Sequence, residues 1–236
     1  MIRAVLFDWG HTLMDWVWDE ELLEAGHREG LRAIGREDVA ITAHFREHYE
    51  PLFWAPGMIE ELEYPGLVRR LLGDFDIAVS DDELARFLEA EHAAWSPARR
   101  LGATSHALLE SLRKRGLKLG LVSNAFDPPA LLHRDLADAG IGDRIDYAVF
   151  SSEVGRRKPD ASIFVRALQA LAVEPPAALF VGDRLYEDVR GARDVGMRTV
   201  QALWFRADEH PDGAEPDFQA FTQMDVLNIV DRLNGE

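Results

Sequence analysis

Short apolar runs alternate with helical segments along most of this 236-residue chain, and this alternation restricts the fold more than any other feature. Buried strands separated by helices are typical of a doubly wound α/β domain with a mainly parallel sheet. Gly116 and Gly196 each follow a helical segment and are expected to end it. The expected strands are Ile2–Asp8, Leu117–Ser123, Tyr147–Ser151, Ala178–Val181 and Arg198–Leu203, and the expected helices are Ser105–Arg115, Pro129–Ala139, Asp160–Leu171, Tyr186–Val195 and Met224–Leu233.

Residues 15–97 interrupt this alternation directly after the first strand. They have helical periodicity and many charges, and a segment of this length is not a structureless loop in a compact domain. We therefore predict a core domain of residues 1–14 and 98–236 and an inserted helical domain of residues 15–97. Arg206–Pro216 is expected to be a surface loop. The insert also contains seven aromatic residues expected to form mainly its own small core: Trp16, Trp18, Phe45, Tyr49, Phe53, Trp54 and Trp95.

Composition excludes several classes of function. The net charge of -16 and the pI near 4.9 argue against nucleic-acid binding, which needs a basic surface. The chain has no cysteine, so disulfides and thiolate metal sites are impossible. No apolar run reaches membrane-spanning length, and the N-terminus lacks the pattern of a signal peptide. We expect a cytoplasmic protein that acts on a small molecule, and its oligomeric state stays open.

Residues suited to phosphate chemistry follow four of the five expected strands. Ligands of open parallel sheets bind outside the carboxyl ends of the strands, so these residues are expected to meet there. Each one alone is more simply a helix cap, a turn or a surface residue. Their order at successive strand ends predicts a shared site that contains Asp8 and Thr12, Ser123 and Asn124, Lys158, and Asp183 with Asp188.

The residue types suggest individual roles. Asp8 is the expected nucleophile, and Mg²⁺ would shield it from the negative charge of a phosphate group. Carboxylates of Asp8, Asp183 and Asp188 and the backbone carbonyl of Gly10 are the expected metal ligands. The phosphate group is expected to contact Thr12, Ser123, Asn124 and Lys158, with Lys158 also neutralising charge that develops during catalysis.

These residues closely resemble the four motifs of the haloacid dehalogenase-like hydrolase superfamily. The matching segments are Asp8-Trp9-Gly10-His11-Thr12, the strand that ends at Ser123-Asn124, Arg157-Lys158-Pro159-Asp160, and Gly182-Asp183 through Asp188. The insert is similar to the helical type 1 cap of subfamily I. The resemblance implies a Rossmann-like core, a covalent intermediate on Asp8 and a magnesium cofactor, with phosphatase the usual activity.

Gly10 departs from the family pattern, which has a second aspartate at this position. That aspartate would protonate the leaving alcohol and then activate the hydrolytic water, and such groups typically contribute about 10²–10⁴-fold to the rate. A phosphatase would therefore need a substitute acid–base group, such as His11, a cap residue or water, or a substrate that needs little help. The simpler interpretation of His11 is a turn residue that points away.

Three other functions remain alternatives. A 2-haloacid dehalogenase would not need the missing acid, because halide leaves without a proton, but the acidic cluster of Asp183, Glu187 and Asp188 favours a cation and phosphate chemistry. A phosphonatase that resembles the known ones needs a cap lysine, whereas the chain's lysines are Lys114, Lys118 and Lys158. A catalytically impaired binding or regulatory protein would not be expected to keep the acidic cluster. A magnesium-dependent phosphatase acting through Asp8 is therefore favoured.

Overall fold

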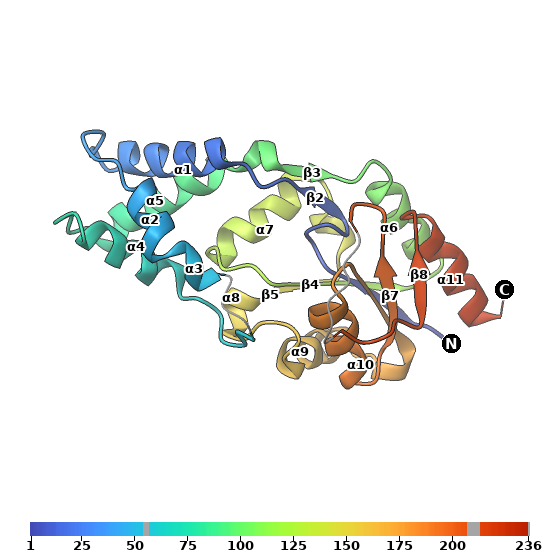
Figure 1. The fold of residues 1–236 in the computed structure, drawn as a ribbon. Helices are drawn as coiled ribbons and strands as arrows, with labels where there is room; N and C mark the ends of the chain where they lie inside the picture. Colours follow the sequence, from blue (N-terminus) through green and yellow to red (C-terminus); the bar gives the residue numbers. More distant parts are fainter. Residues whose placement is uncertain (54–56, 207–212, 236) are drawn as a thin grey trace.

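The computed structural model describes residues 1–53, 57–206 and 213–235. In these ranges, six parallel strands form one sheet in the order β5-β4-β1-β6-β7-β8 (Figure 1). The predicted doubly wound α/β fold is confirmed. Trp54 and residues 207–212 of the expected surface loop lie outside the described residues. The strands are β1 (Ala4–Phe7), β4 (Lys118–Ser123), β5 (Tyr147–Phe150), β6 (Ala178–Gly182), β7 (Arg198–Ala202) and β8 (Phe218–Ala220).

Helices cover both faces of the sheet because the side chains of each central strand alternate between two apolar cores. On β1, Val5 and Phe7 face one core, and Ala4 and Leu6 face the other. Within the described ranges, no helix combines the length and apolar character needed to cross a lipid bilayer. The first core is covered by α6 (Ser105–Lys114), α7 (Pro129–Asp138) and α11 (Asp225–Asn234), and the second by α9 (Ala161–Leu171) and α10 (Gly191–Asp194), while α8 (Ser151–Val154) follows β5 (Figure 1).

The segment after β6 differs from the single helix expected over Tyr186–Val195. Its first part, Leu185–Arg190, is a wide helical turn, and the regular helix α10 occupies only Gly191–Asp194. Within this turn, the Val189 backbone N–H donates to the Arg184 carbonyl at 3.1 Å, and Oδ2 of Asp188 accepts a hydrogen bond from the Arg184 backbone N–H at 2.9 Å. Such wide turns recur at functional sites. The two predicted helix stops are confirmed, because Gly116 and Gly196 have φ values of +75° and +90°.

The insert consists of helices around an apolar cluster of its own. The helices are α1 (Glu20–Ala33), α2 (Thr42–His48), α3 (Glu50–Phe53), α4 (Tyr64–Gly73) and α5 (Asp81–Ala94). The two longest helices of the insert, α1 and α5, pack closely, since a Cβ at Gly30 of α1 would lie 2.8 Å from the Phe87 ring of α5. A capping box of Ser80 and Glu83 begins α5. A two-stranded antiparallel ribbon of β2 (Met14–Trp16) and β3 (Arg99–Leu101) joins the segments that enter and leave the insert.

The insert contacts the core where the chain leaves β4. The ring of Phe126 lies 4.8 Å from the rings of both Phe53 and Tyr64, which belong to the insert. The buried His92 of α5 lies 2.9 Å from the Asp127 carboxylate and 3.0 Å from Asp135. Because Phe126 and Asp127 follow the carboxyl end of β4, these contacts hold the insert at the edge of the sheet where ligands of such folds bind.

Candidate active site

Asp8 lies directly after β1, a central strand of the sheet. Its backbone N–H donates to the Val181 carbonyl of β6 at 2.9 Å, which extends the β1–β6 ladder by one residue. The neighbouring strands β4 and β6 end at Ser123 and Gly182, and Asp183 follows immediately. Ser123 and Asp183 therefore flank Asp8 on either side, as expected for adjacent parallel strands.

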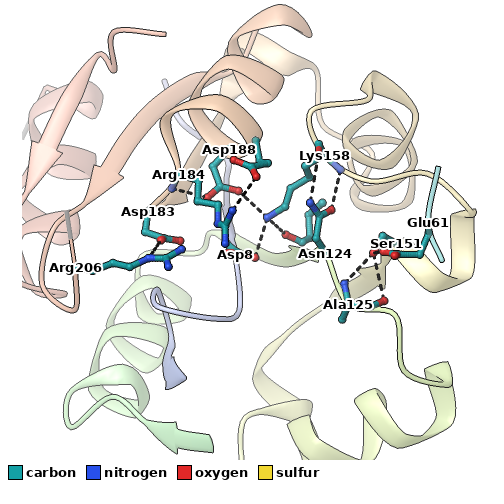
Figure 2. A network of polar contacts seen from close by, with 12 residues as sticks. Asp8, Glu61, Asn124, Ala125, Ser151, Lys158, Asp183, Arg184, Asp188 and Arg206 are labelled. Carbon is teal, nitrogen blue, oxygen red and sulfur yellow. Dashed lines mark hydrogen bonds and ion pairs between the residues drawn. The ribbon is translucent and has the colours of Figure 1, made fainter. Parts of the chain in front are cut away.

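Lys158 joins two of the predicted site carboxylates (Figure 2). Its Nζ lies 2.8 Å from Oδ1 of Asp8 and 2.6 Å from Oδ1 of Asp188, and it donates to the Val122 carbonyl at 3.0 Å. The lysine is 2% exposed. Burial by itself would lower the pKa of Lys158, but the carboxylates of Asp188 and Asp8 outweigh burial and raise this pKa. Lys158 is thus a fixed positive charge beside Asp8.

Asp8, Asp183 and Asp188 form a compact acidic cluster. One carboxylate oxygen from each residue lies within 4.8 Å of the others, and all three residues are buried. Burial, reinforced by the Asp8 charge, raises the pKa of Asp183 to about 6. Burial also raises the pKa of Asp188 to about 7, with Lys158 opposing the shift and Asp8 and Asp183 adding to it. Burial and mutual repulsion thus make the ionised forms of Asp183 and Asp188 costly, and a bound cation would reduce this cost.

The donor set of the cluster fits a hard divalent cation. Mg²⁺ binds through carboxylate oxygens and keeps several water ligands, so three converging aspartates suffice on the protein side. Oδ1 of Asp183 is buried and has no hydrogen-bond partner among the described residues. A buried polar atom without a partner is rare, and a cation would satisfy it. We therefore judge that these three residues suit a magnesium site.

Asn124 and Thr12 were both predicted to contact phosphate, and in the described ranges the structure pairs only the Asn124 side chain with another group. The Asn124 side chain brackets the Lys158 backbone, accepting from its N–H at 2.7 Å and donating to its carbonyl at 3.2 Å. Thr12 is fully buried, and its Oγ1 has no hydrogen-bond partner in the described part of the chain. Asn124 thus orients the lysine loop. Phosphate contacts by Thr12, Ser123 and Asn124 stay predictions.

The turn after Asp8 contains Gly10 and His11. His11 has a φ of +55°, and its Nδ1 lies 3.4 Å from Oδ1 of Asp15. Burial, with a contribution from the Arg206 charge, lowers the pKa of His11, while Asp15 and Asp8 oppose this shift. The lowered pKa of His11 favours its neutral form. A neutral imidazole can accept a proton but is poorly suited to donate one.

Arginine residues were not predicted as part of the site, yet two of them contact its carboxylates. Arg206 follows β7, a strand expected to contribute nothing, and its Nε donates to Oδ2 of Asp183. The Arg184 backbone N–H donates to Asp188, and the Arg184 side chain pairs with Glu187 at 2.9 Å. Glu187 was expected to belong to the acidic cluster, but its carboxylate pairs with Arg184 instead. Arg206 lies outside the four motifs, and Arg184 lies within the fourth at a position to which no role was assigned.

A buried aspartate at the end of the first strand of a doubly wound sheet, with a lysine and two further aspartates at neighbouring strand ends, is typical of a class of hydrolases. Residues 2–196 match the haloacid dehalogenase-like hydrolase family. The chain belongs to this family, as its four motifs predicted.

Three relatives illustrate the likeness. The chain is 30% identical over 240 residues to a glyceraldehyde 3-phosphate phosphatase of Methanopyrus kandleri, covering 99% of both proteins. A solved phosphatase structure of this family from Thermococcus onnurineus has a TM-score of 0.63 and 25% identity, covering 97% of this chain and 98% of that one. A 2-haloacid dehalogenase structure from Pseudomonas syringae has a TM-score of 0.70 and 23% identity, covering 99% and 100%, and shows likeness of fold alone.

Proposed function

We propose that this protein is a magnesium-dependent phosphatase that hydrolyses a small phosphorylated compound through a covalent intermediate on Asp8. The observation that carries the proposal is the acidic cluster of Asp8, Asp183 and Asp188, whose oxygens lie within 4.8 Å of one another. Halide displacement from carbon requires a carboxylate nucleophile but no bound cation. A buried cluster that calls for a cation therefore favours phosphate over haloacid as the substrate.

The full-length relative from Methanopyrus kandleri supports the same choice and suggests a substrate class. That protein is named for glyceraldehyde 3-phosphate, a three-carbon phosphate ester. The likeness to the 2-haloacid dehalogenase is that of the fold, which these two kinds of enzyme share. We infer that a short-chain phosphorylated metabolite is the first substrate class to test.

In the proposed first step, a carboxylate oxygen of Asp8 attacks phosphorus, and the bond between phosphorus and the leaving oxygen breaks. Lys158 holds Asp8 in place and offsets the negative charge that develops on the phosphoryl oxygens. A Mg²⁺ ion held by Asp8, Asp183 and Asp188, with the Gly10 carbonyl, would supply charge neutralisation between nucleophile and phosphate. The Ser123 hydroxyl and Thr12 are assigned to the phosphoryl oxygens.

In the second step, water attacks the phosphorus, inorganic phosphate leaves, and the Asp8 carboxylate is regenerated. This step needs a base, and we assign this role to His11, whose lowered pKa favours the unprotonated imidazole. The first step needs an acid that protonates the leaving oxygen. Because Gly10 has no side chain to provide this proton, solvent supplies it. We therefore expect the first step to be slow for substrates whose leaving alcohol must be protonated.

We assign residues 1–14 and 98–236 to a core domain and residues 15–97 to a cap domain that selects the substrate. The separate apolar cluster of the insert supports this division. Its contacts with Phe126 and Asp127 support a position beside the strand ends. A cap in this position would exclude water during phosphoryl transfer.

The test of the proposed activity is phosphate release from a panel of small phosphate esters, including glyceraldehyde 3-phosphate and phosphoserine. Asp8→Asn serves as the blank, which matters because glyceraldehyde 3-phosphate also eliminates phosphate spontaneously. We expect release that requires Mg²⁺, stops with chelator and is absent in the blank. No enzymatic release from any ester, combined with halide release from 2-haloacids, would reject the phosphatase in favour of a dehalogenase. Release of neither would favour a binding role.

Metal binding has its own prediction that does not require a substrate. At a Mg²⁺ concentration 100 times Kd, binding stabilises the folded state by about 2.7 kcal/mol, which for a chain of this size raises Tm by about 5–10 °C. We expect calorimetry to show this rise and chelator to reverse it. Asp183→Asn should abolish the rise, whereas Asp194→Asn, whose side chain is 62% exposed, should keep it. Equal rises in both variants would place the ion elsewhere.

A further inference from the structure

A short segment of the insert, Ile59–Glu61, pairs with the chain immediately before Lys158. The Arg157 backbone N–H donates to the Ile59 carbonyl at 2.7 Å, and the Glu61 N–H donates to the Gly155 carbonyl at 3.0 Å. Glu60 and Arg156 form the β-bridge between these two contacts. The backbone that leads into the lysine loop is therefore held by the insert as well as by the core.

The Glu61 side chain connects Arg157 with Ser151, and Figure 2 shows Glu61 beside Ser151. One carboxylate oxygen lies 2.9 Å from Nη1 of Arg157, and the other accepts a hydrogen bond from the Ser151 hydroxyl. The Glu61 side chain is only 2% exposed, and Ser151 is fully buried. A buried carboxylate is costly unless it is paired, so these contacts hold Glu61 in one geometry.

Ser151 extends the connection to the loop that follows β4. Its hydroxyl oxygen accepts from the Ala125 N–H at 2.8 Å and lies 3.2 Å from the Ala125 carbonyl. The preceding residue, Asn124, brackets the backbone of Lys158 through its side chain. The two oxygens of Glu61 thus reach both loops that carry the proposed phosphate contacts, one through Arg157 and the other through Ser151.

We propose that Glu61 is a positioning residue of the insert that sets the Lys158 loop and the Ser123–Asn124 loop in their catalytic geometry. The catalytic consequence rests on the proposed phosphatase function, but the structural role does not. The lysine Nζ must remain within hydrogen-bond distance of Asp8, now 2.8 Å, and a shift of about 1 Å in such a group costs about 10²-fold in rate. Glu61 never touches the reacting atoms.

The neighbouring Glu60 is the matched control. It lies in the same segment and pairs with Arg156 at 2.6 Å, but its side chain is 78% exposed. An exposed ion pair of this kind contributes little. Glu61→Ala removes both buried contacts, Glu61→Gln keeps an acceptor for Ser151 and the side-chain shape, and Glu60→Ala removes only the exposed pair.

The experiment combines two measurements on the three variants and the unaltered protein. In steady-state phosphate release, Glu61→Ala is expected to lower kcat by about 10- to 100-fold with a smaller change in KM. The reason is that the variant displaces Lys158 beside the reacting atoms and leaves the contacts to the rest of the substrate in place. Glu61→Gln should recover part of the loss, and Glu60→Ala should stay within about twofold. In amide hydrogen exchange, Glu61→Ala should speed exchange in peptides that contain residues 123–125 and 156–158.

The two measurements separate the failure of this proposal from failure of the proposed function. If the unaltered protein releases no phosphate, the phosphatase assignment fails, and exchange alone decides the role of Glu61. Exchange in both loops unchanged by Glu61→Ala would overturn the positioning role. So would a loss of kcat in Glu60→Ala equal to that in Glu61→Ala. If Glu61→Ala does not fold, the same comparison is made between Glu61→Gln and Glu60→Gln.

Discussion

Asp8→Asn is expected to lower phosphate release by about 10⁴-fold or more, because it removes the proposed nucleophile and leaves an amide in its place. Asparagine has nearly the same shape, and Lys158 keeps its 2.6 Å contact with Asp188. The variant should therefore fold. Phosphate release under saturating Mg²⁺ measures the loss, and circular dichroism together with thermal unfolding verifies the fold.

A covalent assay separates loss of the nucleophile from loss of a metal ligand. Acid-quenched enzyme should carry phosphoryl label from substrate, and the label should be sensitive to hydroxylamine, as an acyl phosphate is. Asp8→Asn should carry no label even at Mg²⁺ concentrations that restore metal binding. Asp38→Asn, on the insert and with a 72% exposed side chain, is the matched control and should label normally. Turnover retained by Asp8→Asn would assign the nucleophile to another group.

Much of the site could be predicted because its members follow parallel strands. The carboxyl ends of such strands meet at one edge, so Asp8, Lys158, Asp183 and Asp188 were expected to converge. The structure brings their side chains together, with the Lys158 Nζ between two of the carboxylates. Local signals were equally informative for helix ends, where Gly116 and Gly196 adopt positive φ.

Residues that act through long-range contacts could not be predicted. Glu61 and Arg206 lie in segments without a motif. Only the folded chain brings Glu61 to Ser151 and Arg206 to Asp183. Asn124 was predicted to contact phosphate, but no sequence pattern indicates that its side chain brackets the Lys158 backbone. These positions depend on tertiary pairing and not on local propensity.

Very short strands also escaped prediction. The ribbon strands β2 and β3 and the edge strand β8 have three residues each, too few to show the alternation that identifies a strand. Regular helix was expected over Tyr186–Val195, whereas Leu185–Arg190 forms a wide turn, because helical periodicity does not distinguish a wide turn from an α-helical one. The Asp188 carboxylate within this turn makes contacts to Lys158 and to the Arg184 backbone that no local pattern indicates.

Gly10→Asp is expected to raise phosphate release from alkyl phosphates by about 10²-fold, since it restores a carboxyl group two residues after the nucleophile. The structure has open space where the new side chain would begin, because a Cβ at Gly10 would meet no atom within 4 Å. Proximity to Asp8 and the other cluster carboxylates should raise the pKa of the new carboxyl group, which favours its role as an acid. Steady-state phosphate release from an alkyl ester measures the gain.

The dependence on the leaving group tests this explanation most directly. A p-nitrophenolate leaves without protonation, so Gly10→Asp should change hydrolysis of p-nitrophenyl phosphate far less than hydrolysis of an alkyl phosphate. Gly10→Asn, which has the same size but carries no transferable proton, should give no gain with either ester. A Gly10→Asp variant that folds and binds Mg²⁺ but loses activity toward both esters would show that the glycine does more than omit an acid. An equal gain with both esters would mean that the added carboxylate acts through the metal or the electrostatic field, because proton donation to the leaving group cannot help an ester that does not need it.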